Sequence, residues 1–315
     1  MGNLPEALLS GEFAFIERLA RALPAPPAGQ VWLGDDAAVL AGGLLFATDA
    51  LAEGVHFDLA FSTLFDAGWK ALAVNCSDLA AMGGTPRAAV AAVVVPHGRP
   101  GVADGLAGGL LAAADAFGCP LVGGDTAVGP ALVLTVAVLG DSPPGGAVLR
   151  SGARPGDAVF VTGPLGGPRA ALGARRRGED PPEASAVRLH RPVPRLAEGR
   201  AAAGAGASAM IDLSDGLSSD LGHICRTSEV GAVLEAAAVP LGPGASLEDA
   251  LAGGDDYELC FTAPDPDRVV EAFSAAGLVA PVRIGTVTEG AEIAVKEGDG
   301  RLRPSPPAGW EHPVP

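Results

Sequence analysis

Seven aspartates lie in five short segments that also carry glycine, serine or threonine. The segments are Gly34-Asp35-Asp36, Ala47-Thr48-Asp49, Asn75-Cys76-Ser77-Asp78, Gly123-Gly124-Asp125-Thr126 and Asp212-Leu213-Ser214-Asp215-Gly216. Carboxylates that gather without counter-ions repel one another, and hard oxygen ligands of this type suit magnesium. The sequence therefore predicts a site for several magnesium ions, and such a site indicates a polyphosphate substrate.

Each segment taken alone also has a plainer interpretation. These are a turn for Asp35-Asp36, a strand end for Asp49, a solvated helix face for Asp78, a Gly-Asp turn for 123–126 and a helix cap for Ser214 or Asp215. However, paired glycines after a strand let the backbone approach a phosphate closely, and a helix N-terminus attracts anions. Because all five segments occur in one chain, we expect them to converge on one site.

The elements that must position these segments alternate between strands and helices. Apolar runs predict strands at 44–48, 88–95, 120–122, 131–139, 158–162 and 209–213, and helical spacing predicts helices at 66–82, 102–117 and from Ser214 onward. A dense cluster of chain breakers, Asp141-Ser142-Pro143-Pro144-Gly145-Gly146, predicts a boundary between residues 1–146 and 147–315. This alternation is typical of the α/β or α+β class in both halves.

Length and composition exclude several kinds of protein. The 315 residues suffice for two domains, and 48% of them are hydrophobic, so a large core is expected. The net charge of -16 and the absence of Lys or Arg runs disfavour a nucleic-acid partner. We expect no signal peptide and no membrane span, since no uninterrupted apolar run reaches ~18 residues. Four scattered cysteines without a CxxC pair fit a reducing compartment, and we therefore expect a cytoplasmic protein.

Several familiar nucleotide-binding motifs are missing from the sequence. There is no GxxxxGK[ST] loop, no set of protein-kinase motifs and no convincing GxGxxG after a strand. If the ligand is a nucleotide, its phosphates must therefore be held largely through metal ions.

Together the acidic segments resemble those of the thiamine-monophosphate kinase family, within the superfamily of aminoimidazole-ribonucleotide (AIR) synthetase-like ATP-binding enzymes. The resemblance runs in family order from near residue 11 to near residue 310. Further matching stretches are Gly11-Glu12-Phe13, Gly54-Val55-His56-Phe57, Lys70 to Gly83, Arg150 to Asp157, Ser219 to Ile224 and Gly253-Gly254-Asp255-Asp256-Tyr257-Glu258-Leu259.

The resemblance implies both a fold and a reaction. The fold would be the two-domain AIR synthetase-like fold, with an N-terminal sheet that forms a barrel across a homodimer and a C-terminal α/β sandwich. The reaction would be the ATP-dependent, magnesium-dependent phosphorylation of thiamine phosphate to thiamine diphosphate by direct in-line transfer, a step of thiamine diphosphate biosynthesis. The attacking phosphate oxygen is already anionic at neutral pH, so no general base is required and no catalytic residue is assigned.

The resemblance also implies a role for particular positions. The magnesium ligands would be Asp36, Ala47 through its carbonyl, Thr48, Asp49, Asp78, Asp125, Asp212 and Asp215. The ATP contacts would be Gly124, Asp125, Arg150 and Ser214, and the thiamine phosphate contacts would be His56, Asp255 and Trp310. Asp255 stands where the family usually has Glu, which leaves open a direct contact or one through water. The remaining histidines, His190 among them, are expected to be structural or surface residues.

Other members of the superfamily are the nearest alternatives. A selenophosphate synthetase would need a reactive cysteine or selenocysteine in an N-terminal loop, and the first 75 residues contain no cysteine. The hydrogenase-maturation relative carries a C-terminal cysteine, whereas this sequence reads His312-Pro313-Val314-Pro315 there. AIR synthetase itself and a magnesium-nucleotide binding module without enzymatic activity also remain open.

Overall fold

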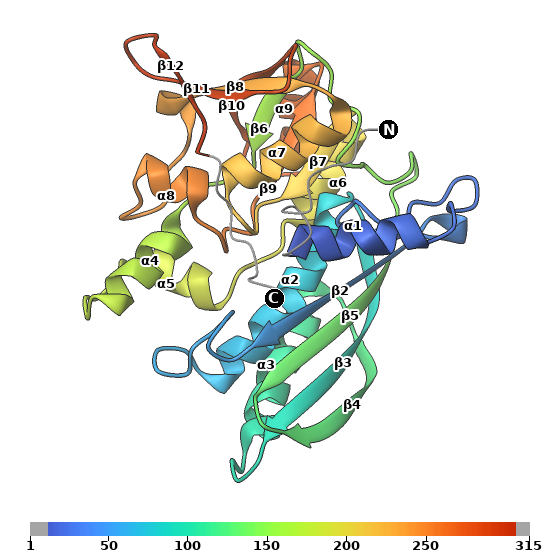
Figure 1. Cartoon of the computed structure of the whole chain (residues 1–315), viewed down its shortest axis with the longest axis vertical. Helices are drawn as coiled ribbons and strands as arrows, with labels where there is room; N and C mark the ends of the chain where they lie inside the picture. The colour runs from blue at the N-terminus through green and yellow to red at the C-terminus, as the bar shows by residue number, and fades with distance from the viewer. Residues whose placement is uncertain (1–11, 307–315) are drawn as a thin grey trace.

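The protein contains two mixed β-sheets, each flanked by helices and lying one above the other (Figure 1). The computed structural model describes residues 12–306, with side chains from residue 15 onward. The strand order is β1-β2-β5-β3-β4 in the first sheet and β12-β11-β8-β10-β6-β9-β7 in the second. The predicted α/β class is therefore confirmed.

The first sheet packs one face against two helices. Its strands are β1 (Ala38–Val39), β2 (Leu44–Ala52), β3 (Thr85–Pro96), β4 (Leu121–Gly129) and β5 (Val133–Asp141). The helices of this half are α1 (Glu12–Ala22), α2 (Leu64–Ala81) and α3 (Val102–Phe117). Strand β5 alternates buried and half-buried residues, as a strand with one core face must. Leu134, Val136 and Val138 lie in a core cluster together with Leu72 of α2 and Leu110 of α3.

Residues on the other face of the first sheet are exposed within the described part of the chain. Phe46 of β2 and Val90 of β3 expose 46% and 43% of their surface there. In the part of the chain that the structure describes, this sheet is open rather than closed into a barrel. The predicted barrel needs a second copy and stays a prediction.

Helix α2 lies between the two sheets. It begins with a capping box, in which Thr63 and Asp66 bond each other's backbone N–H groups. Most of its 18 residues are buried, because α2 contacts α3, β2 and β5 of the first half and α6 and β7 of the second. The plainer interpretation of Asp78, a position on a solvated helix face, is wrong, because the residue is half-buried.

The second sheet is covered on both faces. Its strands are β6 (Ala158–Val161), β7 (Ala209–Asp212), β8 (Gly231–Glu235), β9 (Leu259–Ala263), β10 (Val282–Thr288), β11 (Ile293–Lys296) and β12 (Leu302–Pro304). The helices of this half are α4 (Gly167–Arg176), α5 (Glu183–His190), α6 (Leu196–Ala205), α7 (Leu217–Ser228), α8 (Leu247–Ala252) and α9 (Pro266–Ala275). One core cluster joins the sheet to α6 and α9, and a second joins it to α7 and α8, which makes the predicted α/β sandwich.

Three predicted boundaries that bear on the acidic segments are wrong. Strand β2 continues to Ala52, so Thr48 and Asp49 lie within it rather than at its end. Residues 123–126 lie inside β4, because they pair with β3 in a continuous ladder, and not in a loop after a strand. Helix α7 begins at Leu217 with Gly216 as its N-cap, so neither Ser214 nor Asp215 caps it.

Two further expectations are not settled by the fold. The predicted boundary at residues 146/147 falls between β5 and β6 and stays a prediction. Trp310 and Gly11 lie outside the described residues. Within residues 12–306, none of the helices combines the length and the apolar character needed to cross a membrane.

Helices α2 and α3 cross at two glycines that allow their backbones to touch. A Cβ atom on Gly109 would lie 1.9 Å from the Phe65 carbonyl oxygen, and one on Gly68 would lie 2.2 Å from that of Leu106. By contrast, Gly108 is exposed, and a Cβ there would meet a Phe65 ring carbon at 3.6 Å, which is an ordinary contact.

We expect Gly109→Ala to destabilise the protein by about 1–3 kcal/mol, because the helices must separate to admit the methyl group. Gly108→Ala is the matched control, since it gains helix propensity of about 1 kcal/mol without a clash. Urea unfolding followed by circular dichroism measures both. Equal stability of the two variants would show that the helices do not depend on this contact.

Candidate functional site

Three carboxylates from distant parts of the chain meet between the two halves. They belong to Asp36, in the loop before β1, to Asp78 of α2 and to Asp212 at the end of β7. One carboxylate oxygen from each lies within 4.8 Å of the others. Helix α2 brings Asp78 to Asp212 because it packs against β7. A cluster of carboxylate oxygens alone is the donor set that magnesium prefers.

Hydrogen bonds orient the members of this acidic cluster. The buried Ser77 hydroxyl donates to Asp212 Oδ2 at 2.6 Å. The backbone N–H of Asp49 donates to the side-chain oxygen of Asn75 at 3.0 Å, which ties β2 to α2 one turn before Asp78. Asp49 is thereby a fourth carboxylate of the cluster, and its charge acts on that of Asp78.

Negative charge outweighs positive charge in the cluster, and the pKa values of Asp49, Asp78 and Asp212 reflect this. Burial and then the charge of Asp36 raise the pKa of Asp212 to about 8. Burial and then the charge of Asp49 raise the pKa of Asp78 well above its usual range. Asp49 keeps some exposed surface, yet the protein around its carboxyl and the charge of Asp36 raise its pKa too. Because a bound cation favours the ionised forms, these groups fit a metal site.

Arg150 is the cation nearest to the cluster. Its Nη2 and Nε donate to the two oxygens of Asp36, at 2.8 and 3.3 Å, and its backbone N–H donates to Asp35. These bonds separate the adjacent carboxylates, so that Asp36 faces the cluster and Asp35 faces the Arg150 backbone. Burial, followed by the charge of Asp36, raises the pKa of Asp35 to about 7. The Arg150 side chain remains 22% exposed, and its unused N–H groups suit a phosphate.

Asp215 and Ser214 lie in a loop that continues from Asp212. The buried carboxylate of Asp220 accepts hydrogen bonds from the backbone N–H groups of Asp215 and Gly216, both at 3.1 Å. Asp220 was not among the predicted site residues. Its position within the first turn after Gly216 is the signal in the sequence that would have indicated it.

The other predicted metal ligands lie in the first sheet. Ala47 is buried in the middle of β2, and the hydroxyl of Thr48 donates to the Val136 carbonyl at 2.9 Å. Asp125 and Gly124 are exposed on β4, the edge strand. Asp125 is in register with Ala92 of β3, and the same row continues through β5 to Ala50 of β2. Asp125 therefore lies three strand spacings, roughly 14 Å, from β2. Within one chain, Asp125 is therefore not brought to the cluster.

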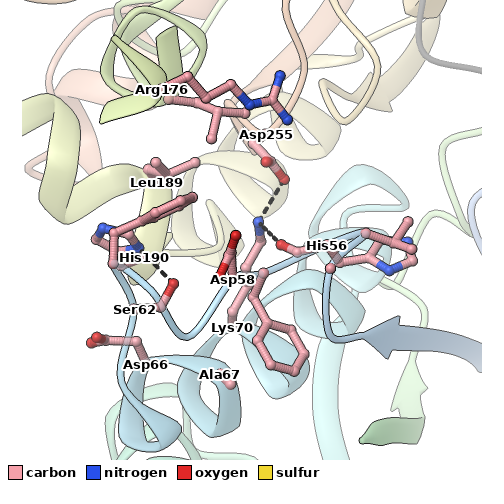
Figure 2. Close-up of a pocket in the computed structure, with 15 residues that line it drawn as sticks. His56, Asp58, Ser62, Asp66, Ala67, Lys70, Arg176, Leu189, His190 and Asp255 are labelled. Atoms are coloured by element: carbon pink, nitrogen blue, oxygen red, sulfur yellow. Dashed lines mark hydrogen bonds and ion pairs between the residues drawn. The ribbon is translucent and has the colours of Figure 1, made fainter. Parts of the chain in front are cut away.

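A pocket next to the cluster brings together two of the predicted substrate contacts, His56 and Asp255 (Figure 2). Lys70 of α2 extends between them: its Nζ lies 2.8 Å from Asp255 Oδ1 and donates to the His56 carbonyl at 3.1 Å. The Nδ1 atom of His56 accepts from the Ala52 N–H at 3.0 Å. A neutral His56 ring therefore carries its proton on Nε2 and is a donor there.

Several pocket residues were missed from the sequence. They include Lys70, Arg176 of α4 and His190 at the end of α5. His190 was expected to be structural or at the surface, and that stays a prediction; its Nδ1 lies 3.4 Å from the hydroxyl of Ser62, another residue that lines the pocket. Burial lowers the pKa of His190, so a neutral ring is favoured. The signal for Lys70 was available, because it is one of only two lysines in the sequence and stands in an apolar helix.

The loop that carries Asp255 is anchored on both sides. The backbone N–H groups of Asp255 and Tyr257 donate to the carbonyls of Ser214 and Leu213, both at 2.8 Å. At its base, the fully buried Glu258 accepts hydrogen bonds from Arg188 and Arg195. The pocket and the acidic cluster are thus walled by two loops that are hydrogen-bonded to each other.

The chain matches the models of the AIR synthase related proteins in two parts. The model of the N-terminal domain matches residues 34–141, and the model of the C-terminal domain matches residues 154–297.

Proteins that are similar over most of this chain are named thiamine-monophosphate kinase. The thiamine-monophosphate kinase of Salmonella typhimurium (strain LT2) is 39% identical over 276 residues, which is 82% of this chain and 84% of that protein. A solved structure described as "AaThiL complexed with AMPPCP and TMP" has a TM-score of 0.82 at 31% identity and covers 99% of this chain and 100% of its own. The structure of thiamine-monophosphate kinase from Stenotrophomonas maltophilia K279a has a TM-score of 0.75 at 36% identity and covers 93% of this chain and 98% of its own.

These matches confirm the two-domain AIR synthase-like fold that the acidic segments predicted. At this identity and coverage, the chain belongs to the thiamine-monophosphate kinase family.

Proposed function

We propose that this protein transfers the γ-phosphoryl group of ATP to thiamine phosphate, giving ADP and thiamine diphosphate, in a magnesium-dependent reaction. The observation that carries the proposal is the meeting of Asp36, Asp78 and Asp212 beside the pocket that holds His56 and Asp255. Family membership and the structural neighbour described with AMPPCP and TMP support it.

The main obstacle to this reaction is the approach of two polyanions. Magnesium ions, held by Asp36, Asp49, Asp78 and Asp212, would neutralise phosphate charge and stabilise the transferring group. Arg150 would bind a phosphate with the N–H groups that Asp36 does not use. We also retain Asp215, Ala47, Thr48 and Asp125 as proposed metal contacts, and Gly124 and Ser214 as proposed ATP contacts. An anionic phosphate nucleophile needs positioning rather than a general base.

The pocket would hold the thiamine part of the substrate. His56 offers a donor at Nε2, and Asp255 offers a carboxylate, which suits a cation or an amino group. Both residues line the pocket, and they come from different halves of the chain. Trp310, outside the described residues, remains a proposed contact to the thiamine ring.

We further propose that the protein is a cytoplasmic homodimer built from domains 1–146 and 147–315. The exposed face of the first sheet, with Phe46 and Val90, offers an apolar surface for a second copy. A dimer would also account for Asp125, which lies exposed on edge strand β4 and apart from the cluster of its own chain. In that arrangement Asp125 of one protomer completes the metal site of its partner.

The first prediction concerns the reaction itself. Incubation with ATP, magnesium and thiamine phosphate is expected to yield thiamine diphosphate, detected by chromatography. Asp212→Asn should lower kcat by on the order of 10²-fold or more, because the magnesium that would stabilise transition-state charge loses a ligand. Asp115→Asn, an exposed change on α3, is the control and should retain full activity. Wild-type enzyme that forms no thiamine diphosphate would contradict the proposed function and favour another member of the superfamily.

The second prediction concerns stability without metal. A carboxyl group with a raised pKa holds its proton more tightly in the folded state, so its contribution to stability falls as pH rises. For Asp212 this loss extends from about pH 4, its usual range, to about 8. The melting temperature of the metal-free protein should therefore fall between about pH 5 and pH 8.

Magnesium should raise the melting temperature more at the higher pH, because it binds the ionised carboxylates. Differential scanning fluorimetry measures the effect, and Asp212→Asn should weaken both the pH dependence and the gain from magnesium. A magnesium effect that is the same at both pH values would contradict a site made of these groups.

The third prediction concerns the shared site. Asp125→Asn and Asp212→Asn should each be nearly inactive as homodimers. If Asp125 serves the partner's cluster, co-expressed mixed dimers contain one site with both aspartates intact and should regain a substantial part of the activity. If both residues serve the same protomer, every mixed site lacks one of them, and no activity returns. Purification through two different affinity tags isolates the mixed dimer for the assay.

A further inference from the structure

Lys70 is a buried ammonium group in the wall of the pocket. Its exposure is 3%, and Ala67, Ala73 and Val74, about one turn away along α2, are buried too. Burying an ammonium group is costly unless it is paired and hydrogen-bonded. Two partners meet this requirement: Asp255 Oδ1 at 2.8 Å and the His56 carbonyl at 3.1 Å. Lys70 thus touches both residues that are proposed to contact thiamine phosphate (Figure 2).

Asp255 is held in one orientation from several directions. Its backbone has φ +71°, and that of Tyr257 has φ +49°, a region that side chains rarely adopt. The Tyr257 hydroxyl donates to Asp255 Oδ1 at 3.3 Å, the same oxygen that Lys70 contacts. The other oxygen, Oδ2, has no partner among the described residues, and the side chain is 32% exposed to the pocket.

The two contacts on Oδ1 have a chemical consequence. They orient the carboxylate plane, and they leave Oδ2 as the acceptor that faces the pocket. Lys70 also offsets the charge of Asp255, so that the carboxylate acts as a directed hydrogen-bond acceptor more than as a free anion. Thiamine offers such an acceptor an exocyclic amino group and a cationic ring.

We propose that Lys70 is a positioning residue for thiamine phosphate, which acts by fixing Asp255 across the pocket so that Oδ2 receives the substrate. This inference rests on the proposed function and deepens it. Lys70 belongs to α2 of the first half, and Asp255 to the loop between α8 and β9 of the second half. The substrate-binding geometry is therefore set by an ion pair that joins the two halves.

A purely structural role for Lys70 makes a different prediction. If the ion pair only stabilised the contact between the halves, its loss would lower the melting temperature and would affect ATP and thiamine phosphate alike. A positioning role instead affects the KM for thiamine phosphate selectively and requires Asp255 to be present. A double-mutant cycle separates the two roles.

The experiment compares Lys70→Met, Asp255→Asn and the double variant. Lys70→Met keeps the length of the side chain and removes the charge. We expect it to raise the KM for thiamine phosphate about tenfold, the effect of one lost charge-assisted hydrogen bond. The KM for ATP and kcat should each change by less than about twofold, within the range of indirect effects. In the Asp255→Asn background, Lys70→Met should add less than about twofold.

Lys296→Met is the matched control, since it removes the other lysine and its exposed pair with Glu235. It should leave all constants unchanged. If Lys70→Met proves too unstable to assay, Tyr257→Phe removes the second contact on Oδ1 without removing a charge and should raise the same KM in the same selective way.

The outcomes are distinguishable from a failure of the proposed function. Wild-type protein that forms no thiamine diphosphate would refute the function itself. Wild-type turnover with an unchanged KM in Lys70→Met would overturn the role of Lys70 alone. An equal rise of the KM for thiamine phosphate on Lys70→Met with and without Asp255→Asn would also overturn it. Lys70 would then act on the substrate or on the fold directly. Tyr257→Phe with unchanged KM would overturn it likewise.

Discussion

Repulsion among carboxylates between the two halves is the constraint on which this structure depends. Four aspartates from both halves approach one another, and Arg150 is the nearest cation to them. Burial, followed by the charges of neighbouring aspartates, disfavours the ionised forms and raises the pKa values of Asp78 and Asp212. A folded protein tolerates such an arrangement because the surrounding core supplies the stability that the site itself lacks.

The core does so by burying most of α2 between the sheets. The glycine contact with α3 brings that helix close on one side, and α6 and β7 cover it on the other. As a result Asp78, Ser77 and Lys70 have little freedom, although they come from one apolar helix. The same buried helix therefore supplies Lys70 to the pocket and Asp78 to the acidic cluster.

Much of this could be predicted from the sequence, and the exceptions have physical reasons. Five aspartate segments that also carry glycine, serine or threonine indicated a common site. The structure brings Asp36, Asp78 and Asp212 together. Strand ends were predicted poorly, since the β2 and β4 ladders continue through residues of low strand propensity when a neighbouring strand pairs with them. Lys70, Asp220 and Glu258 were missed because their partners lie far away in the chain or in turns that only the fold creates. No spacing along the sequence reports a contact between α2 and the loop before β9.

The burial of α2 has a consequence for how this chain tolerates changes in length. Each residue added to an α-helix rotates everything after it by about 100°. An insertion between Lys70 and Asp78 would leave the pocket wall in place but carry the carboxylate away from Asp36 and Asp212. A surface helix could absorb such a rotation by sliding, whereas most residues of α2 are buried against both halves of the chain. The eight-residue separation of Lys70 and Asp78 along α2 therefore fixes the position of the substrate pocket relative to the acidic cluster.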